Sequence, residues 1–174
     1  MIELLILFSL TKKELTMYGI QKAIADIFAA YTKPSFGAIK PALKRLEKCG
    51  FITSRRSISE GGKQFGFYSI TNDGYTELKR LLLAPVSENP VQFLSNARIK
   101  IACASFLSKN EINDLLFKLK TRALEHKFEA ENTLNNEYIS LTFYQRIILD
   151  NTVCEYQNLA TLIENLEKEN AGNS

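Results

Sequence analysis

Residues 33–52 read KPSFGAIKPALKRLEKCGFI, and this stretch decides the fold. Ser35 can cap a helix that runs to Cys49, and Gly50 follows as a C-terminal stop. The apolar residues of this helix fall on one face, at spacings of three and four: Ile39, Leu43 and Leu46. Basic residues occupy its other faces. The stretch therefore predicts an amphipathic helix with one buried face and one basic edge.

The segments around this helix predict its partners in the fold. Apolar periodicity and turn residues indicate helices at Met1–Leu10 and Thr16–Tyr31, strands at Phe51–Ile58 and Phe65–Thr71, and a helix from Thr71 or Asn72 to near Ala84. Residues 59–64 (SEGGKQ) are typical of a hairpin tip between the two strands. Three helices followed by a two-stranded hairpin indicate the winged form of the helix-turn-helix.

A linker divides the chain. Residues 84–90 (APVSENP) hold two prolines among small and polar residues, and proline disfavours helix at the residue before it. We therefore expect a winged helix-turn-helix domain at 1–84, a linker at 85–90 and a second domain at 91–174.

The second half predicts long helices with an uncovered apolar seam. A first stripe consists of Phe93, Ala97, Ile101 and Ala104. Ser108 with Glu111 three residues later is a capping box, and a last helix spans about Leu141–Glu169. Its seam is formed by Leu149, Val153, Tyr156, Ala160, Ile163 and Leu166. Because such helices cannot form a thick core alone, we expect a second copy to cover the seam. The expected fold class is mainly α with a small β-hairpin, in which the second domain dimerises.

Charge is unevenly distributed along the chain, although the net charge is only +3. Residues 1–84 carry 13 Lys and Arg against 7 Asp and Glu, whereas residues 85–174 carry 9 against 12. Seven of the basic residues lie within Lys33–Arg56, beside a single acid, Glu47. A basic segment joined to an acidic half favours a domain that binds a polyanion; a solvated helix face is the alternative.

The sequence gives no support for an enzyme. Gly61, Gly62 and Gly66 lack the spacing of a phosphate-binding loop, and no His, Cys, Asp and Glu set has the spacing of metal ligands. His126, the one histidine, lies among charged residues, so we expect it at the surface. We expect no cofactor and no metal.

Cysteine spacing and hydropathy indicate the compartment. The cysteines are about 50 residues apart, too far for a zinc site or a disulfide framework, and we expect buried, inert thiols at Cys49, Cys103 and Cys154. The apolar stretch Leu4–Leu10 is far shorter than the roughly 20 residues of a membrane span, and no basic region of a signal peptide precedes it. We expect a reduced, cytoplasmic protein without a membrane partner.

The basic segment yields candidate contacts to double-stranded DNA. A helix of this length fits the major groove, and its first turn usually reaches the base edges. The candidates are Lys33, Ser35, Ala38, Lys40, Lys44, Arg45, Arg55, Arg56, Gly62 and Lys63. We expect Ser35, Ala38 and Lys40 to reach bases and most of the others to contact phosphates, which contribute affinity and salt sensitivity.

Residues 33–52 resemble the recognition-helix signature of PadR-type transcriptional regulators, which reads Pro-Ser-x-Gly-small-(Ile/Val)-Tyr-Pro-x-Leu-x-Arg-Leu-Glu followed by Gly-Leu-Ile. Residues 17–19 (MYG), 60–63 (EGGK) and 67–74 (FYSITNDG) also match, in the same order. The resemblance implies a homodimeric repressor that binds a palindromic operator near its own or a neighbouring gene. It also implies a small-molecule effector, since some members respond to phenolic acids and others to drugs.

The chain departs from this signature at two places. Lys40 stands where the family has tyrosine. In the wing, Gln64, Phe65 and Gly66 replace the usual basic residues, and Ser69 replaces a common arginine. These departures leave an altered or weaker DNA site as an alternative to the usual operator of the family. A second hypothesis is a winged-helix-derived interaction protein with weak or non-specific DNA binding.

Aromatic residues are the only candidates for an effector pocket. They are Phe93, Phe106, Phe143, Tyr144 and Tyr156. Aromatics at helical spacing belong more often to a core than to a ligand site, so we assign no effector residue.

Overall fold

The computed structural model describes residues 1–58 and 64–172, and the chain forms two compact units. Unit 1 consists of Met1–Pro85 and Arg98–Phe106, and unit 2 of Val86–Ala97 and Leu107–Ser174. The first boundary between the units, after Pro85, lies within the predicted linker at 85–90. The assignment of Arg98–Phe106 to unit 1 was not predicted from the sequence.

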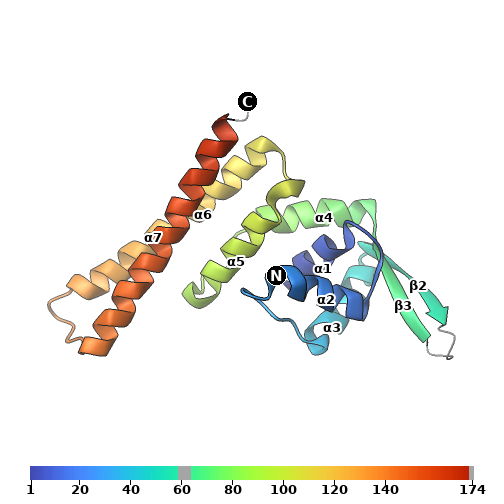
Figure 1. Cartoon of the computed structure of the whole chain (residues 1–174), viewed down its shortest axis with the longest axis horizontal. Helices are drawn as coiled ribbons and strands as arrows, with labels where there is room; N and C mark the ends of the chain where they lie inside the picture. The colour runs from blue at the N-terminus through green and yellow to red at the C-terminus, as the bar shows by residue number, and fades with distance from the viewer. Residues whose placement is uncertain (59–63, 173–174) are drawn as a thin grey trace. The chain divides into compact units, whose positions relative to one another are not determined.

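Unit 1 has the predicted order of elements with one addition (Figure 1). These are α1 (Ile2–Leu10), β1 (Leu15–Thr16), α2 (Met17–Phe28), α3 (Phe36–Lys48), β2 (Ile52–Ile58), β3 (Gln64–Ile70) and α4 (Asn72–Leu83). The expected fold class, mainly α with a small β element, is confirmed. The addition is β1, whose two residues are too few to show strand alternation in the sequence.

Helix α1 lies at the centre of unit 1 and contacts α2, α3 and α4. Five of its residues are buried: Leu4, Leu5, Ile6, Leu7 and Leu10. Helices α2 and α3 are amphipathic instead, and each buries one face against this core. Burial of α1 on several sides explains why its sequence is apolar almost all round.

The sheet of unit 1 has the strand order β1-β3-β2, and both pairs are antiparallel. The pairing of β2 with β3 runs from Ile52 opposite Ile70 to Ile58 opposite Gln64. The start of α4 closes this hairpin, because the Thr71 hydroxyl donates to the Gly50 carbonyl at 2.7 Å and accepts from the Gly74 N–H at 3.0 Å. The base of the wing is thereby fixed to the end of α3.

Glycine is required at two positions around this junction. Gly50 has a φ of 77°, a left-handed conformation that ends α3 as the sequence predicts. A Cβ added at Gly74 would lie 2.0 Å from the Phe51 carbonyl oxygen, so only glycine permits α4 to start this close to β2.

The remaining elements are helices: α5 (Pro90–Ala102), a 3-10 turn (Ala104–Phe106), α6 (Lys109–Asn135) and α7 (Phe143–Gly172). Helices α6 and α7 of unit 2 lie side by side (Figure 1). The predicted capping box at the start of α6 is confirmed, since the Ser108 N–H donates to the Glu111 carboxylate at 2.9 Å. Within residues 1–58 and 64–172, no helix combines the length and apolarity that crossing a membrane requires.

The expected surface position of His126 is wrong. Its side chain is buried between Phe93, 5.1 Å away ring to ring, and Tyr156, which stacks on it at 5.2 Å. Nδ1 is 3.1 Å from the exposed carboxylate of Glu129. His126 faces the α7 side of α6, and its neighbours along the chain face solvent.

The prediction of buried cysteines holds only for Cys103. Burial raises the pKa of the Cys103 thiol to about 12, so this thiol is inert. Cys49 and Cys154 are exposed. Cys49 is the C-cap residue of α3, and Cys154 lies on α7 outside its buried positions.

Candidate nucleic-acid interface

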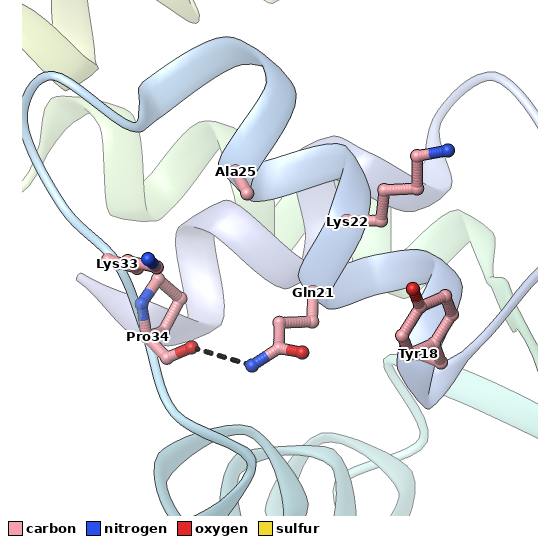
Figure 2. Close-up of a pocket in the computed structure, with 6 residues that line it drawn as sticks. All are labelled: Tyr18, Gln21, Lys22, Ala25, Lys33 and Pro34. Atoms are coloured by element: carbon pink, nitrogen blue, oxygen red, sulfur yellow. Dashed lines mark hydrogen bonds between the residues drawn. The ribbon is translucent and has the colours of Figure 1, made fainter.

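The turn between α2 and α3 is built by side chains that bond to the backbone. Ser35 caps α3, as predicted, and its hydroxyl oxygen accepts from the Ala38 N–H at 3.3 Å. Gln21 of α2 donates from Nε2 to the Pro34 carbonyl at 3.2 Å (Figure 2). These bonds fix the entry of α3 relative to α2.

Helix α3 has one face in the core and one face free. Its buried residues are Ile39, Ala42, Leu43 and Leu46. Lys40 and Lys44, one helical turn apart, are exposed and have no ion-pair partner among the described residues. Pro41 lies between them and removes one helical N–H. The exposed edge can therefore present two uncompensated charges to an anion.

Two predicted arginines are already engaged within the chain. Arg45 donates from Nε to the Glu3 carboxylate at 2.7 Å. Arg55 bonds to Glu14 through both Nε, at 2.9 Å, and Nη2, and its guanidinium lies 4.5 Å from the centre of the Phe67 ring. The Arg55 guanidinium lowers the pKa of the Glu14 carboxyl, mainly through this hydrogen bond. To bind DNA, each arginine must either bond to a phosphate in addition to its carboxylate or exchange the carboxylate for a phosphate.

The other predicted residues have different settings. Lys33, Ala38 and Arg56 are exposed, and Arg56 lies opposite Gly66 in the β2–β3 pair. Gly62 and Lys63, the predicted wing tip, lie outside the described residues.

A depression beside α3 contains residues that the sequence prediction missed (Figure 2). It is lined by Tyr18, Gln21, Lys22, Ala25, Lys33 and Pro34. Tyr18 and Lys22 are exposed and four residues apart on α2, on the opposite side from its buried Ile20 and Ile24. The spacing of Tyr18 and Lys22 is visible in the sequence, but spacing alone does not show that they lie beside α3.

The arrangement is suited to binding a polyanion. In the described parts of the chain, no cluster of His, Cys, Asp and Glu could hold a metal ion. The exposed cations of α3, of the turn before it and of β2 belong to the same unit as the helix-turn-helix and its wing.

Comparison with known proteins identifies this arrangement. The sequence model of the Transcriptional regulator PadR-like family matches residues 6–80, from α1 through the wing and into α4. Over these residues, the chain belongs to this family. It is therefore a DNA-binding transcription regulator, and PadR-like proteins are regulators, not enzymes. No curated protein sequence matches the chain.

Several solved structures are similar to the chain. A PadR family regulator from Clostridium difficile R20291 is 32% identical, covering 45% of this chain and 79% of that one, with a TM-score of 0.40. Bacillus subtilis PadR in complex with operator DNA is 23% identical, covering 97% and 98%, with a TM-score of 0.47. The same protein in complex with p-coumaric acid is 22% identical, covering 98% of each chain, with a TM-score of 0.43.

The predicted dimerisation residues divide into two groups in this PadR-like chain. Tyr156, Ala160 and Ile163 are buried within the single chain, on the α7 face that packs with α6. Leu149, Val153 and Leu166 are half-buried. The apolar periodicity of α7 therefore also serves packing inside unit 2, an alternative that the spacing alone could not separate from a dimer seam.

The five candidate effector aromatics do not form one group. Phe93 and Tyr156 pack with His126 in unit 2. Phe106 packs on Phe8 and Tyr75 in unit 1, with ring centres 5.7 and 6.4 Å away. Phe143 and Tyr144 are both exposed and contact each other edge to face.

Proposed function

We propose that this protein is a homodimeric repressor that binds a palindromic operator through α3. The observation that carries the proposal is the exposed pair Lys40 and Lys44, which has no ion-pair partner in the described part of the chain and lies on a helix whose opposite face is buried. A helix of 13 residues fits the major groove, and its flanking cations can neutralise phosphates. Two copies related by a two-fold axis would read half-sites about 34 Å apart.

Exposed apolar side chains of unit 2 support dimerisation. Phe117, Leu124 and Phe128 form one stripe of α6 and are 63, 42 and 63% exposed. Exposed rings and aliphatic chains also gather at the start of α7, where Tyr144 and Ile148 line a shallow apolar depression. Contiguous apolar surface of this kind marks interaction sites. We propose that these residues, with Leu149, Val153 and Leu166, contact the second copy.

Substitution of the α6 stripe tests the dimer. Phe117→Asp with Phe128→Asp should give a monomer by sedimentation at micromolar concentration, because burying two carboxylates opposes association. Asn113→Asp adds a charge at an exposed polar position of the same helix and should leave a dimer. A monomeric wild-type protein would contradict the proposal.

The effector and the compartment complete the proposal. Since one similar protein has been solved with p-coumaric acid, we propose a small aromatic molecule as the effector that releases the DNA. We place the protein in the cytoplasm, where its DNA partner is found.

A gel-shift experiment tests the function. The gene's own upstream region is searched for an inverted repeat, and a duplex containing it is compared with a scrambled duplex of the same composition. We expect a specific complex whose affinity falls steeply with salt, because binding releases counterions. Equal affinity for both duplexes across the salt range would reject operator recognition.

One observation favours the second candidate, a winged-helix interaction protein with weak or non-specific DNA binding. Arg55 of the wing is already neutralised by Glu14, which lowers the charge that the wing offers to DNA. Equal binding to both duplexes together with a tight protein partner would support this candidate.

A further inference from the structure

The first turn of α3 offers almost no hydrogen-bonding side chains to DNA. Phe36, Gly37 and Ala38 are all exposed and carry no polar side-chain atom. The Ser35 hydroxyl oxygen is occupied as the helix cap, accepting from the Ala38 N–H. The next polar side chain along the helix is that of Lys40. The turn that normally reaches base edges is therefore apolar here.

An aromatic pair enlarges this apolar surface. The Phe36 ring is 41% exposed and stacks on Tyr18 of α2, with ring centres 6.5 Å apart and an angle of 25° between the planes. Tyr18 is 68% exposed. The Tyr18 ring packs against the Phe36 ring. Phe36 is thus held in place while much of its face is open to solvent.

The charges around this surface favour DNA as its partner. Lys22 and Lys33 border the depression beside Tyr18 (Figure 2). Lys40 follows on α3. All three lysines are exposed, and none has an ion-pair partner among the described residues. Cations on either side of an apolar turn can bind the phosphates on both sides of a groove, which brings the turn against the bases.

Only one apolar group is available to such a turn in the major groove. Each base pair presents donors and acceptors there, and thymine adds its C5-methyl group. We propose that Phe36 and Ala38, supported by Tyr18, recognise thymine methyl groups, so that these residues set the sequence preference. This inference rests on the proposed function and names the base chemistry that the same site recognises.

Removal of the methyl group alone tests the inference. A duplex is selected from a random pool by the wild-type protein and then remade with deoxyuridine in place of thymidine, first at all positions and then one at a time. Burial of one methyl group corresponds to roughly a fourfold change in affinity. We expect wild-type affinity to fall by about that factor at one or two positions in each half-site.

Two variants locate the effect. Phe36→Ala with Ala38→Gly should bind the thymidine and deoxyuridine duplexes equally, because the apolar contact is gone. Lys44→Ala is the matched control on the same helix: it should bind both duplexes more weakly but keep the wild-type ratio between them. Circular dichroism melting checks that each variant is folded.

The outcomes separate this inference from the proposed function. If no duplex is selected over the random pool, the proposed function fails. If a duplex is selected but deoxyuridine leaves the affinity unchanged, DNA binding stands and thymine recognition is overturned. Loss of the methyl effect in Lys44→Ala, or its persistence in the Phe36 and Ala38 variant, would also overturn it.

Discussion

Basic residues serve two different purposes in unit 1. On α3, Lys40 and Lys44 are exposed and have no ion-pair partner within residues 1–58 and 64–172. Arg55 and Lys100, in contrast, are fully engaged by the protein itself. Arg55 is paired with Glu14, and Lys100 is only 2% exposed.

Lys100 is the extreme case of internal use. Its ammonium donates to the carbonyls of Leu81 at 3.0 Å, Leu82 at 2.9 Å and Ala84, at the C-terminal end of α4. A cation at a helix C-terminus satisfies carbonyls that have no helical partner. The comparison shows that the location of a positive charge in the fold, and not the number of such charges, decides whether DNA can use it.

The largest expected effect is loss of the free charges. Lys40→Ala with Lys44→Ala should lower operator affinity by about two orders of magnitude near physiological salt, because a dimer loses four positive charges that face the DNA. The slope of log affinity against log salt should become shallower by about 3 to 4. Fluorescence anisotropy over a salt series measures both quantities.

A matched pair of lysines controls for net charge. Lys118→Ala with Lys168→Ala removes the same charge from unit 2, where both residues are exposed. We expect this control to retain nearly all of the affinity. An equal loss in the two double variants would mean that net charge, and not the α3 edge, governs binding.

The next effect concerns the buried cation. Lys100→Met should destabilise unit 1 by about 1–3 kcal/mol, because it leaves buried carbonyls of α4 without a donor. DNA affinity of the folded protein should be unchanged. Urea unfolding at pH 7 measures the loss, and a variant as stable as the wild type would show that these hydrogen bonds contribute nothing.

The same residue gives a pH dependence of stability. Burial lowers the pKa of Lys100 from 10.5 to about 8. Between these values the unfolded chain binds more protons at Lys100 than the folded one, so Lys100 should contribute a rise of about 1–3 kcal/mol to the free energy of unfolding between pH 8 and 10.5. Above pH 9 the buried Cys103 thiol, whose pKa is raised to about 12, contributes in the opposite direction, so the Lys100 contribution is read as the difference between the wild type and Lys100→Met. Lys100→Met should lack this rise, and an identical pH profile in both proteins would exclude Lys100 as its source.

The smallest effect is the release of an engaged arginine. Glu14→Gln removes the negative charge from Arg55, so the wing gains a usable cation. We expect affinity for DNA of any sequence to increase about threefold, in line with the small energies of exposed pairs. Arg55→Ala should cancel this gain in the double variant, and a gain that survives it would assign the effect to another residue.

Local signals made most of unit 1 predictable. Ser35 as a cap, Gly50 as a stop and the spacing of Ile39, Leu43 and Leu46 all concern neighbours along the chain. Such signals depend on backbone geometry alone. They therefore identified α3 and its basic edge before any tertiary contact was known.

Contacts between distant residues were not predictable in the same way. Arg45 meets Glu3 across 42 positions and Arg55 meets Glu14 across 41, and no pattern in the sequence announces either pair. The predicted surface position of His126 was wrong because charged neighbours in the sequence do not indicate which face of α6 packs against α7. The apolar residues of α7 were visible, but their spacing fits an intrachain neighbour and a second copy equally well.

The return of residues 98–106 to unit 1 bears on how this protein can be dissected. A fragment cut at the proline-rich linker would keep every residue expected to touch DNA. It would nevertheless lack Lys100, so the carbonyls at the end of α4 would lose this hydrogen-bond donor. Such a truncation should therefore be less stable than unit 1 in the whole chain, although its recognition surface would be intact. A fragment extended to Phe106 should regain the hydrogen bonds of Lys100.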